Sequence, residues 1–367
     1  MSKNSPKIKL CFIAPKAYTL FNPKVKHNFG GAEVDLYYLA VELAKDINYS
    51  ITFITADYSN GAGVENIKDV NLIRTFNFKQ NSIIGFIKFW KGLSRADAEY
   101  YIIKTISPGM FITALFCFIK RKSFIYRSAS SECCDGTYIK AHNFYGILYK
   151  WAVKRASIVF VQNQSDQVLL LSTTGVLSNS IPNGHPLPIV DISKKDTVLW
   201  VGRSAAIKQP ELFIHLAAKF PEEKFIMISP RSTGDSNYER LKDEIGDLKN
   251  LEFIEFVEFA KVQAYFTSAK IFVNTSEAEG FPNTFIQACI SSTPILSLQV
   301  NPDKVLDKYN IGISCSGDIE QLNEKLHLIL TDNNLRLKMG NNAREYAEEK
   351  HNIKKIADIY KKILGDN

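Results

Sequence analysis

The sequence is poor in cysteine, and it has no long hydrophobic run and no low-complexity tract. Six cysteines occur among the 367 residues, with no Cys-x-x-Cys pair and no regular spacing beyond the adjacent Cys133 and Cys134. This pattern argues against a disulfide framework or a cysteine-based zinc site, and it favours a reducing compartment. The longest apolar run, residues 110–119, is about half of the ~20 residues that a membrane-spanning helix needs. With no signal-peptide core after the first lysines, we expect a cytoplasmic protein.

Acidic residues are scarce in the first half of the chain. Lys and Arg number 45 against 38 Asp and Glu, which gives a formal net charge of +7. Residues 1–190 hold 22 basic and 12 acidic side chains, whereas residues 191–367 hold 23 and 26. The positive excess of the first half predicts an anionic partner. Nucleic acid is not expected, because the sequence contains no recognisable nucleic-acid module and no stripe of alternating Arg and aromatic residues.

Short runs of β-branched and aromatic residues alternate with longer helical patterns along most of the chain. This alternation is typical of βα units that build parallel sheets. It occurs twice, which predicts two separately wound α/β layers with ligands at the carboxyl ends of their strands. The expected strands are 8–13, 50–55, 71–76, 100–105, 123–126, 157–161, 197–201, 224–228, 251–254, 271–274 and 294–297. The expected helices are 33–45, 111–119, 141–155, 164–171, 210–219, 282–290, 319–330, 334–350 and 353–364.

A proline-rich segment separates the two alternations. Residues 182–188 contain three prolines and one glycine, a composition that can continue neither a helix nor a strand. The length of the chain also favours two domains of ~150 to 200 residues. We therefore expect an amino-terminal domain over 1–185, a carboxyl-terminal domain over 186–350, and a last helix within 351–367 that packs back on the amino-terminal domain.

Residues 276–288, Ser-Glu-Ala-Glu-Gly-Phe-Pro-Asn-Thr-Phe-Ile-Gln-Ala, follow directly after an expected strand. The segment combines the carboxylate of Glu279 with a glycine that allows a close backbone approach and with Pro282 at the first position of a helix. A helix N-terminus at the carboxyl end of a strand favours an anion such as a diphosphate. A plain strand-to-helix turn, with Glu279 as a solvated or capping carboxylate, explains the pattern equally well.

Two further loops carry candidate ligand groups. Val201-Gly202-Arg203 ends the first strand after the linker, and Lys208 follows five residues later. Two cations on one loop suit the oxygens of a diphosphate, although either cation can be a solvated surface charge. Phe29-Gly30-Gly31-Ala32-Glu33 lies between the first strand and a helix, where glycines let the backbone pass close to a ligand. A simple loop in which Glu33 complements the helix dipole fits this segment as well.

Together these segments resemble the retaining glycosyltransferases of family 4, which have the GT-B fold. The resemblance rests, in chain order, on Gly-Gly-x-Glu at 30–33, Ile-Pro-Asn-Gly at 181–184, Gly202-Arg203 with Lys208, and Glu-Gly-Phe-Pro at 279–282. It covers nearly the whole chain and implies two Rossmann-like, doubly wound parallel-sheet domains that face each other across a cleft. It also implies transfer of a sugar from a nucleotide-diphosphate sugar to a hydroxyl acceptor, in cell-surface polysaccharide, lipopolysaccharide or glycolipid synthesis.

The resemblance also implies roles for single residues. Arg203 and Lys208 would bind the diphosphate and stabilise it as it leaves, and Glu279 would hold the donor sugar; these three are the catalytic candidates. The donor-binding candidates are Gly30, Gly31, Gly280, Phe281, Pro282, Asn283 and Gln287. No cofactor is implied, and because no Asp-x-Asp cluster occurs, the protein cations would replace a metal. Similar enzymes are thought to retain configuration by same-face attack, with the leaving phosphate oxygen helping to deprotonate the acceptor.

Gln287 departs from the family pattern. The family has a second glutamate eight positions after the first, where a glutamine can still exchange hydrogen bonds with ribose hydroxyls but brings no charge. The departure leaves donor affinity and nucleotide preference open. It also motivates two alternatives, a nucleotide-sugar epimerase of the same fold and a catalytically silent relative that binds donor without transfer. The stretch 126–132 matches the place where similar enzymes often carry a histidine near the reaction centre, and it contains none.

Residues 83–95 predict a basic amphipathic helix. The apolar face holds Ile83, Phe86, Trp90 and Leu93, and the other face holds Lys88, Lys91 and Arg95. Such a helix can lie in a membrane interface, and Lys-Arg-Lys at 120–122 adds positive charge. This predicts peripheral docking on an anionic inner leaflet, where the acceptor would be a glycan or a lipid-linked glycan. An ordinary surface helix that buries Phe86 and Trp90 in its own domain is the simpler alternative.

Overall fold

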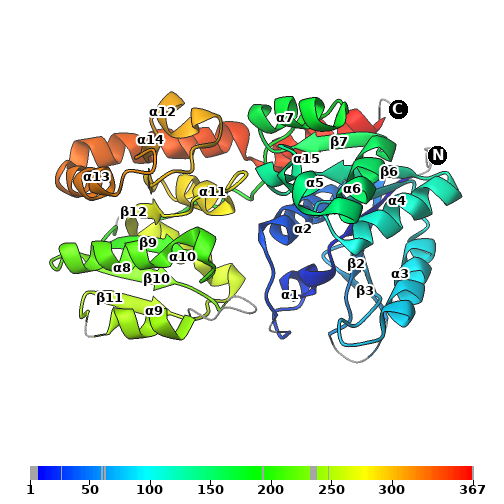
Figure 1. Cartoon of the computed structure of the whole chain (residues 1–367), viewed down its shortest axis with the longest axis horizontal. Helices are drawn as coiled ribbons and strands as arrows, with labels where there is room; N and C mark the ends of the chain where they lie inside the picture. Colours follow the sequence, from blue (N-terminus) through cyan, green and yellow to red (C-terminus); the bar gives the residue numbers. More distant parts are fainter. Residues whose placement is uncertain are drawn as a thin grey trace. The chain divides into compact units, whose positions relative to one another are not determined.

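A computed structural model describes residues 7–25, 27–58, 61, 63–191, 194–231, 238–246 and 248–365 (Figure 1). The chain divides into two compact units. The amino-terminal unit extends to Pro186 and includes the residues from Ile353 onwards, and the carboxyl-terminal unit is Leu187–Asn352. Each unit is an α/β layer built around a sheet of its own. This confirms the predicted fold class of two doubly wound, parallel-sheet units.

The described residues of the amino-terminal unit form an eight-stranded sheet in the order β3-β4-β2-β1-β5-β6-β7-β8. Its strands are parallel except for β3, an edge strand that runs antiparallel to β4. The central strands are almost fully buried, as expected for a sheet covered by helices on both faces. The strands are β1 (Ile8–Ile13), β2 (Tyr49–Thr55), β3 (Val64–Ile67), β4 (Val70–Arg74), β5 (Tyr100–Ile103), β6 (Ser123–Arg127), β7 (Ile158–Val161) and β8 (Asn179–Ser180).

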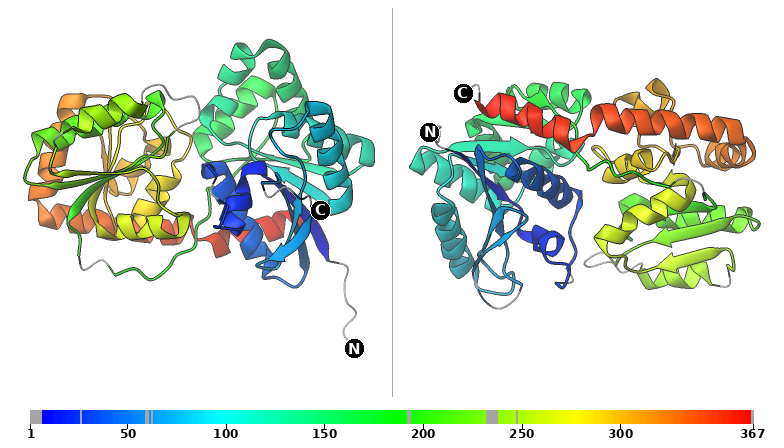
Figure 2. Two further views of the ribbon diagram at one scale, coloured as in Figure 1. Left: turned by 90° about the horizontal axis from the view of Figure 1, so that it is seen from below. Right: turned by 180° about the vertical axis from the view of Figure 1, so that it is seen from behind.

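The helices of this unit include the last helix of the chain, α15, which lies beside α2 (Figure 2). One face of α15 buries Ile356, Tyr360 and Leu364. The helices are η1 (Pro15–Ala17), α1 (Tyr18–Phe21), α2 (Gly31–Ala44), α3 (Ser82–Ala96), α4 (Pro108–Lys120), η2 (Ser131–Cys133), α5 (Thr137–Ala141), α6 (Asn143–Arg155), α7 (Gln164–Thr174) and α15 (Ile353–Gly365). No helix within the described ranges of the whole chain is both long enough and apolar enough to span a bilayer.

In the carboxyl-terminal unit, the described residues form a six-stranded parallel sheet in the order β11-β10-β9-β12-β13-β14. The strands are β9 (Thr197–Val201), β10 (Lys224–Ile228), β11 (Leu251–Ile254), β12 (Ala269–Asn274), β13 (Ile295–Ser297) and β14 (Gly312–Ser314). The helices are η3 (Ala206–Lys208), α8 (Pro210–Lys219), α9 (Tyr238–Ile245), α10 (Phe259–Ser268), α11 (Asn283–Ile290), η4 (Pro302–Lys304), α12 (Val305–Lys308), α13 (Ile319–Thr331) and α14 (Asn333–Lys350).

Each sheet reverses its direction of winding next to its first strand. In the carboxyl-terminal unit the chain lays β10 and β11 on one side of β9 and then places β12 on the other side (Figure 1). In the amino-terminal unit β2 and β5 flank β1 in the same manner. Open α/β sheets bind their ligands outside the carboxyl ends of the strands at such a switch point. The fold therefore predicts one ligand position in each unit.

Two local predictions from the sequence are wrong. Pro282 is the residue before the first turn of α11 and not its first helical residue. The helix expected over residues 83–95 is present as α3, but the simpler alternative, in which Phe86 is buried in its own domain, is wrong, because the buried residues of α3 are Phe89, Gly92 and Leu93. Ile83 and Phe86 are 70% and 42% exposed. Nearly every turn of α3 offers apolar residues on two faces, so the packing against the sheet decides which face is buried.

A buried cluster of charged and polar side chains joins distant segments of the amino-terminal unit. The Asp35 carboxylate accepts hydrogen bonds from Lys104 Nζ and Arg127 Nε, each at 2.7 Å. Arg127 also donates to the Tyr360 hydroxyl at 3.0 Å and to Asn183 Oδ1 at 3.0 Å. All five residues are at most 2% exposed. The cluster ties α15 and the segment after β8 to the centre of this unit.

Burial shapes the ionisation of this cluster. Burial by itself raises the pKa of the Asp35 carboxyl, but the charges of Arg127 and Lys104 more than offset it and hold the pKa below its ordinary value. Burial lowers the pKa of Lys104 to about 8, although Asp35 opposes that shift. One carboxylate thus balances two cations in a place without solvent, so Asp35 is the residue on which the balance depends.

Candidate functional site

Two loops meet at the switch point of the carboxyl-terminal unit. One follows β9 and contains Arg203 and η3, and the other follows β12 and leads to α11. Because β9 and β12 are parallel neighbours, their carboxyl ends lie at the same edge of the sheet. The loops are joined directly, since Glu277 N donates to Ile207 O at 3.0 Å and Thr275 Oγ1 donates to Lys208 O at 2.6 Å.

At this edge Lys208 and Glu279 form an ion pair. Lys208 Nζ lies 2.7 Å from Glu279 Oε2, and the two side chains are 20% and 18% exposed. The other oxygen, Oε1, accepts hydrogen bonds from Ser276 Oγ at 2.8 Å and from Asn274 Nδ2 at 3.1 Å. The carboxylate is therefore fixed from three sides. An ammonium group has three N–H donors, so Lys208 keeps further donors for the oxygens of an anion.

Arg203 lies on the loop after β9 and is exposed. Among the residues that the structure describes, its guanidinium has no ion-pair or hydrogen-bond partner. A guanidinium that is always charged and presents a planar set of donors is suited to two oxygens of a phosphate. The preceding Gly202 lies close to the Trp200 ring, and a Cβ there would come within 2.8 Å of a ring carbon. The close approach explains why glycine precedes Arg203.

The remaining predicted residues of this unit line the start of α11. Gly280 and Phe281 are buried, and the centroids of the Phe281 and His351 rings lie 4.9 Å apart. Pro282 lies just before the helix, and Asn283 is its first residue. Gln287 lies one turn further along α11 and is 9% exposed. The positive end of the helix dipole is thus at the edge of the sheet that carries Arg203 and Lys208.

Gly30 and Gly31 belong to the amino-terminal unit. Gly30 precedes the first turn of α2, and Gly31 is the first residue of that helix. The Gly30 N–H donates to Glu33 Oε2 at 2.8 Å. This contact caps the N-terminus of α2, as expected for a simple loop in which Glu33 complements the helix dipole. The donor contact implied by the resemblance stays a prediction.

Sequence reasoning missed several groups that shape the site. Asn274 and Ser276 hold Glu279, and Trp200 Nε1 donates to Thr275 Oγ1 at 2.9 Å. Their only signal in the sequence is position, because Asn274 ends an apolar strand and Ser276 opens the segment already singled out. Arg127, which belongs to the stretch 126–132, is part of the buried cluster around Asp35. In the described part of the chain no three His, Cys, Asp or Glu side chains gather as metal ligands would.

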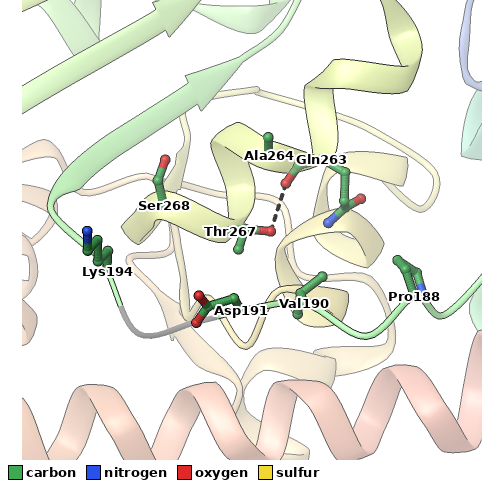
Figure 3. A pocket seen from close by; sticks show the side chains of 8 residues that line it. All are labelled: Pro188, Val190, Asp191, Lys194, Gln263, Ala264, Thr267 and Ser268. Carbon is green, nitrogen blue, oxygen red and sulfur yellow. Dashed lines mark hydrogen bonds between the residues drawn. The ribbon is translucent and has the colours of Figure 1, made fainter.

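A pocket of about 410 Å³ lies in a different part of this unit (Figure 3). It is lined by Pro188, Val190, Asp191, Lys194, Gln263, Ala264, Thr267 and Ser268. Gln263 contributes from α10, and its Nε2 donates to Gln287 O at 2.9 Å and to Ser291 Oγ at 2.7 Å. Gln263 thus links α10 to the carboxyl-terminal half of α11 through the backbone of Gln287, whereas residues 279–283 lie at the N-terminal end of that helix.

A family model and several curated proteins match the chain. Residues 189–346 match the family described as "Glycosyl transferases group 1". An uncharacterized glycosyltransferase of Methanocaldococcus jannaschii is 23% identical over 92% of this chain and 95% of its own length. The O-antigen biosynthesis glycosyltransferase WbnH of Escherichia coli is 23% identical over 78% of this chain and 82% of its own length.

Solved structures share the fold across nearly the full chain. Sucrose-phosphate synthase from Thermosynechococcus elongatus superposes with a TM-score of 0.78 at 17% identity, covering 98% of this chain and 100% of that chain. HepE from Anabaena, solved in complex with UDP, superposes with a TM-score of 0.73 at 16% identity, again covering 98% and 100%. At these identities the likeness concerns the fold, and both units take part in it.

Proposed function

We propose, on the premise that the chain belongs to the glycosyl transferases group 1 family, that it moves a hexosyl unit from a nucleoside-diphosphate sugar to a hydroxyl acceptor with retention of configuration. The observation that carries the proposal is the set of cations at the switch point. Lys208 is held beside Glu279, and Arg203 is exposed on the loop after β9, at the edge of the sheet where α11 begins. Two cations and a helix dipole at one edge suit a diphosphate.

The reaction fits these groups. The bond that breaks joins the anomeric carbon to a phosphate oxygen, and its electron pair goes to that oxygen. The bond that forms joins the anomeric carbon to the acceptor oxygen, and the acceptor proton passes to the departing phosphate oxygen. Arg203, Lys208 and the α11 N-terminus stabilise the negative charge that develops on the leaving group. We propose that these groups take the place of a metal ion.

Glu279 and Gln287 complete the proposed donor site. Glu279 is fixed by three donors, so its carboxylate is already oriented to accept hydrogen bonds from sugar hydroxyls when the donor arrives. Gln287 lies one turn into α11, where its amide can exchange hydrogen bonds with ribose hydroxyls. The likeness to WbnH and the positive charge of the amino-terminal half support a role in cell-surface polysaccharide, lipopolysaccharide or glycolipid synthesis.

A thermal-shift panel of UDP-, GDP-, ADP- and CMP-sugars tests the donor class. A ligand that binds only the native state raises the melting temperature by mass action. We expect one nucleotide class to stabilise the carboxyl-terminal unit, and the panel starts with UDP because HepE holds it. Arg203→Ala should reduce the shift, whereas Arg240→Ala, which removes an exposed arginine of α9, should leave it unchanged. A shift with the CMP-sugar alone, whose nucleotide has a single phosphate, or no shift with any nucleotide, would overturn the proposed donor class.

We further propose that the amino-terminal unit docks on an anionic membrane surface. Four apolar side chains at the start of α3 are at least 42% exposed: Ile83, Ile84, Phe86 and Ile87. The exposed cations nearby are Lys88, Lys91 and Arg95 on α3, with Lys120 and Arg121 at the end of α4. Exposed apolar side chains beside basic ones are typical of helices that lie in a membrane interface.

Liposome co-sedimentation tests the membrane proposal. We expect the wild-type chain to sediment with vesicles that contain anionic lipid and to remain in the supernatant with neutral vesicles. Ile83→Ser with Ile87→Ser should weaken this binding, whereas Ile319→Ser, at an exposed position on α13, should not. Equal sedimentation with both vesicle types, or none with either, would contradict membrane docking.

A further inference from the structure

The amino-terminal unit contains a pocket at its own switch point, separate from the groups assigned to the donor. Ile13 and Pro15 line it from the end of β1, Ile103 from the end of β5, and Phe76 from the segment after β4. Its volume is about 350 Å³, which is within the range of small-ligand sites. The position at the carboxyl ends of β1 and β5 is where an open α/β sheet binds ligands.

Apolar side chains form most of the pocket wall. Phe76 packs edge-on against Phe78 and against Phe89, with ring centroids 5.2 and 5.9 Å apart. The apolar residues that line the pocket are Ile13, Pro15, Phe76, Phe78, Phe86, Phe89, Ile103, Pro108 and Ile112. A surface of this composition favours a hydrocarbon over a sugar, because burial of apolar area provides the binding free energy.

Three side-chain oxygens at the rim already accept hydrogen bonds within the unit. Asn81 Oδ1 caps α3 by accepting from Ile83 N at 2.8 Å, and Ser107 Oγ caps α4 by accepting from Met110 N at 3.4 Å. Gln80 Oε1 accepts from Lys88 Nζ at 3.0 Å. These three side-chain oxygens therefore each have one partner already, while the buried Gln80 Nε2 has none among the described residues. Most of the remaining lining is the hydrocarbon wall.

The entrance combines exposed apolar groups with positive charge. Phe78 and Phe86, which line the pocket, are 52% and 42% exposed, and Ile83 beside them on α3 is 70% exposed. Lys88 is held at the rim through Gln80, and the exposed Lys16 follows Pro15 in the chain. An apolar cavity with cations at its mouth complements an amphiphile that has a hydrocarbon chain and an anionic head.

We propose that this pocket binds the hydrocarbon chain of an amphiphilic phosphate, an acyl or isoprenoid lipid whose head carries the accepting hydroxyl. The inference rests on the proposed function, because it names the chemical class of the acceptor. The chain enters between α3 and α4, and the phosphate stays at the mouth beside Lys88. This arrangement presents the head group of the lipid at the carboxyl edge of the sheet.

Two glycines allow the pocket to be filled without disturbing the core. A Cβ on Gly109, in the first turn of α4, would lie 3.7 Å from Phe89 and 3.9 Å from Ile103, which are ordinary contacts with pocket-lining atoms. A Cβ on Gly85 of α3 would lie 3.5 Å from Gln80 Nε2. Gly109→Leu and Gly85→Leu therefore place a side chain in the cavity, and leucine favours a helix more than glycine does.

The test measures saturable binding of a dansyl-labelled undecanoic acid to the full chain by fluorescence. We expect dodecyl phosphate to displace the probe and glycerol phosphate to fail, because the shorter compound lacks the hydrocarbon. Each leucine variant should bind the probe at least about tenfold more weakly. Gly365→Leu, where a Cβ at the end of α15 meets nothing within 4 Å, should bind like the wild type.

Three results would overturn the pocket assignment: no saturable probe binding by the wild type, unchanged binding in both leucine variants, or equal displacement by glycerol phosphate. Melting temperatures of all variants show that they are folded, and two independent variants keep the test valid if one fails to fold. Nucleoside-diphosphate binding, measured on the same proteins, separates the two proposals. Donor binding without probe binding refutes the pocket alone, and probe binding without any donor refutes the proposed function alone.

Discussion

Lys208→Met is expected to slow donor cleavage by about 10² to 10³-fold while the chain stays folded. The ammonium group is held 2.7 Å from Glu279 at the edge where the α11 N-terminus lies, so its charge is in place before the diphosphate departs. Methionine fills a similar volume but cannot stabilise the developing charge. Release of nucleoside diphosphate by transfer to water measures the step and requires no known acceptor.

Lys261→Met is the matched control for this prediction. Lys261 also pairs with a glutamate of the same unit, at 3.1 Å from Glu258, but both side chains are more than half exposed. Its loss should leave the cleavage rate within about twofold, since exposed pairs contribute little. If Lys208→Met cleaves donor at the rate of Lys261→Met, the assignment of Lys208 to the leaving group is wrong.

Asp35→Asn is expected to destabilise the amino-terminal unit by about 3 to 5 kcal/mol. The substitution keeps the shape of the side chain but removes the single negative charge that balances Lys104 and Arg127, all of them at most 2% exposed. Hydrogen exchange of the β1, β5 and β6 peptides at increasing urea reports this unit separately from the other. The midpoint should move to a clearly lower urea concentration.

Lys104→Met provides the contrast that identifies charge balance as the cause. It removes one of the two cations and leaves Asp35 paired with Arg127 at 2.7 Å, so its effect should be clearly smaller than that of Asp35→Asn. A larger loss of stability from Lys104→Met than from Asp35→Asn would show that packing, and not the balance of charge, governs the cluster.

The alternating pattern of the sequence was sufficient to predict the fold class and most of the strands. Apolar runs such as those of β9 and β12 are flanked by turn residues, and the order of the motifs along the chain indicated the family whose model matches residues 189–346. Long-range contacts left no such signal. The cluster around Asp35 combines a helix, two strand ends, the linker and the last helix, and no local pattern marks these residues as neighbours.

The candidate site shows the same division between local and distant information. The segment around Glu279 could be recognised because glycine, proline and a carboxylate follow one strand. The hydrogen bonds from Asn274 and Ser276, and the pairing with Lys208, depend on how the β9 and β12 loops meet. The sequence also left open whether Phe86 is buried or exposed, because residues 83–95 offer apolar groups on two faces and packing against the sheet selects Phe89.

The most direct test of the central claim compares a nucleoside diphosphate with its monophosphate by titration calorimetry. The nucleoside is the one that the donor panel selects. The wild type should bind the diphosphate at least about tenfold more tightly than the monophosphate, and Lys208→Met should lose most of this preference. Equal affinities in the wild type, or a preference that survives in Lys208→Met, would contradict a diphosphate site built on this lysine.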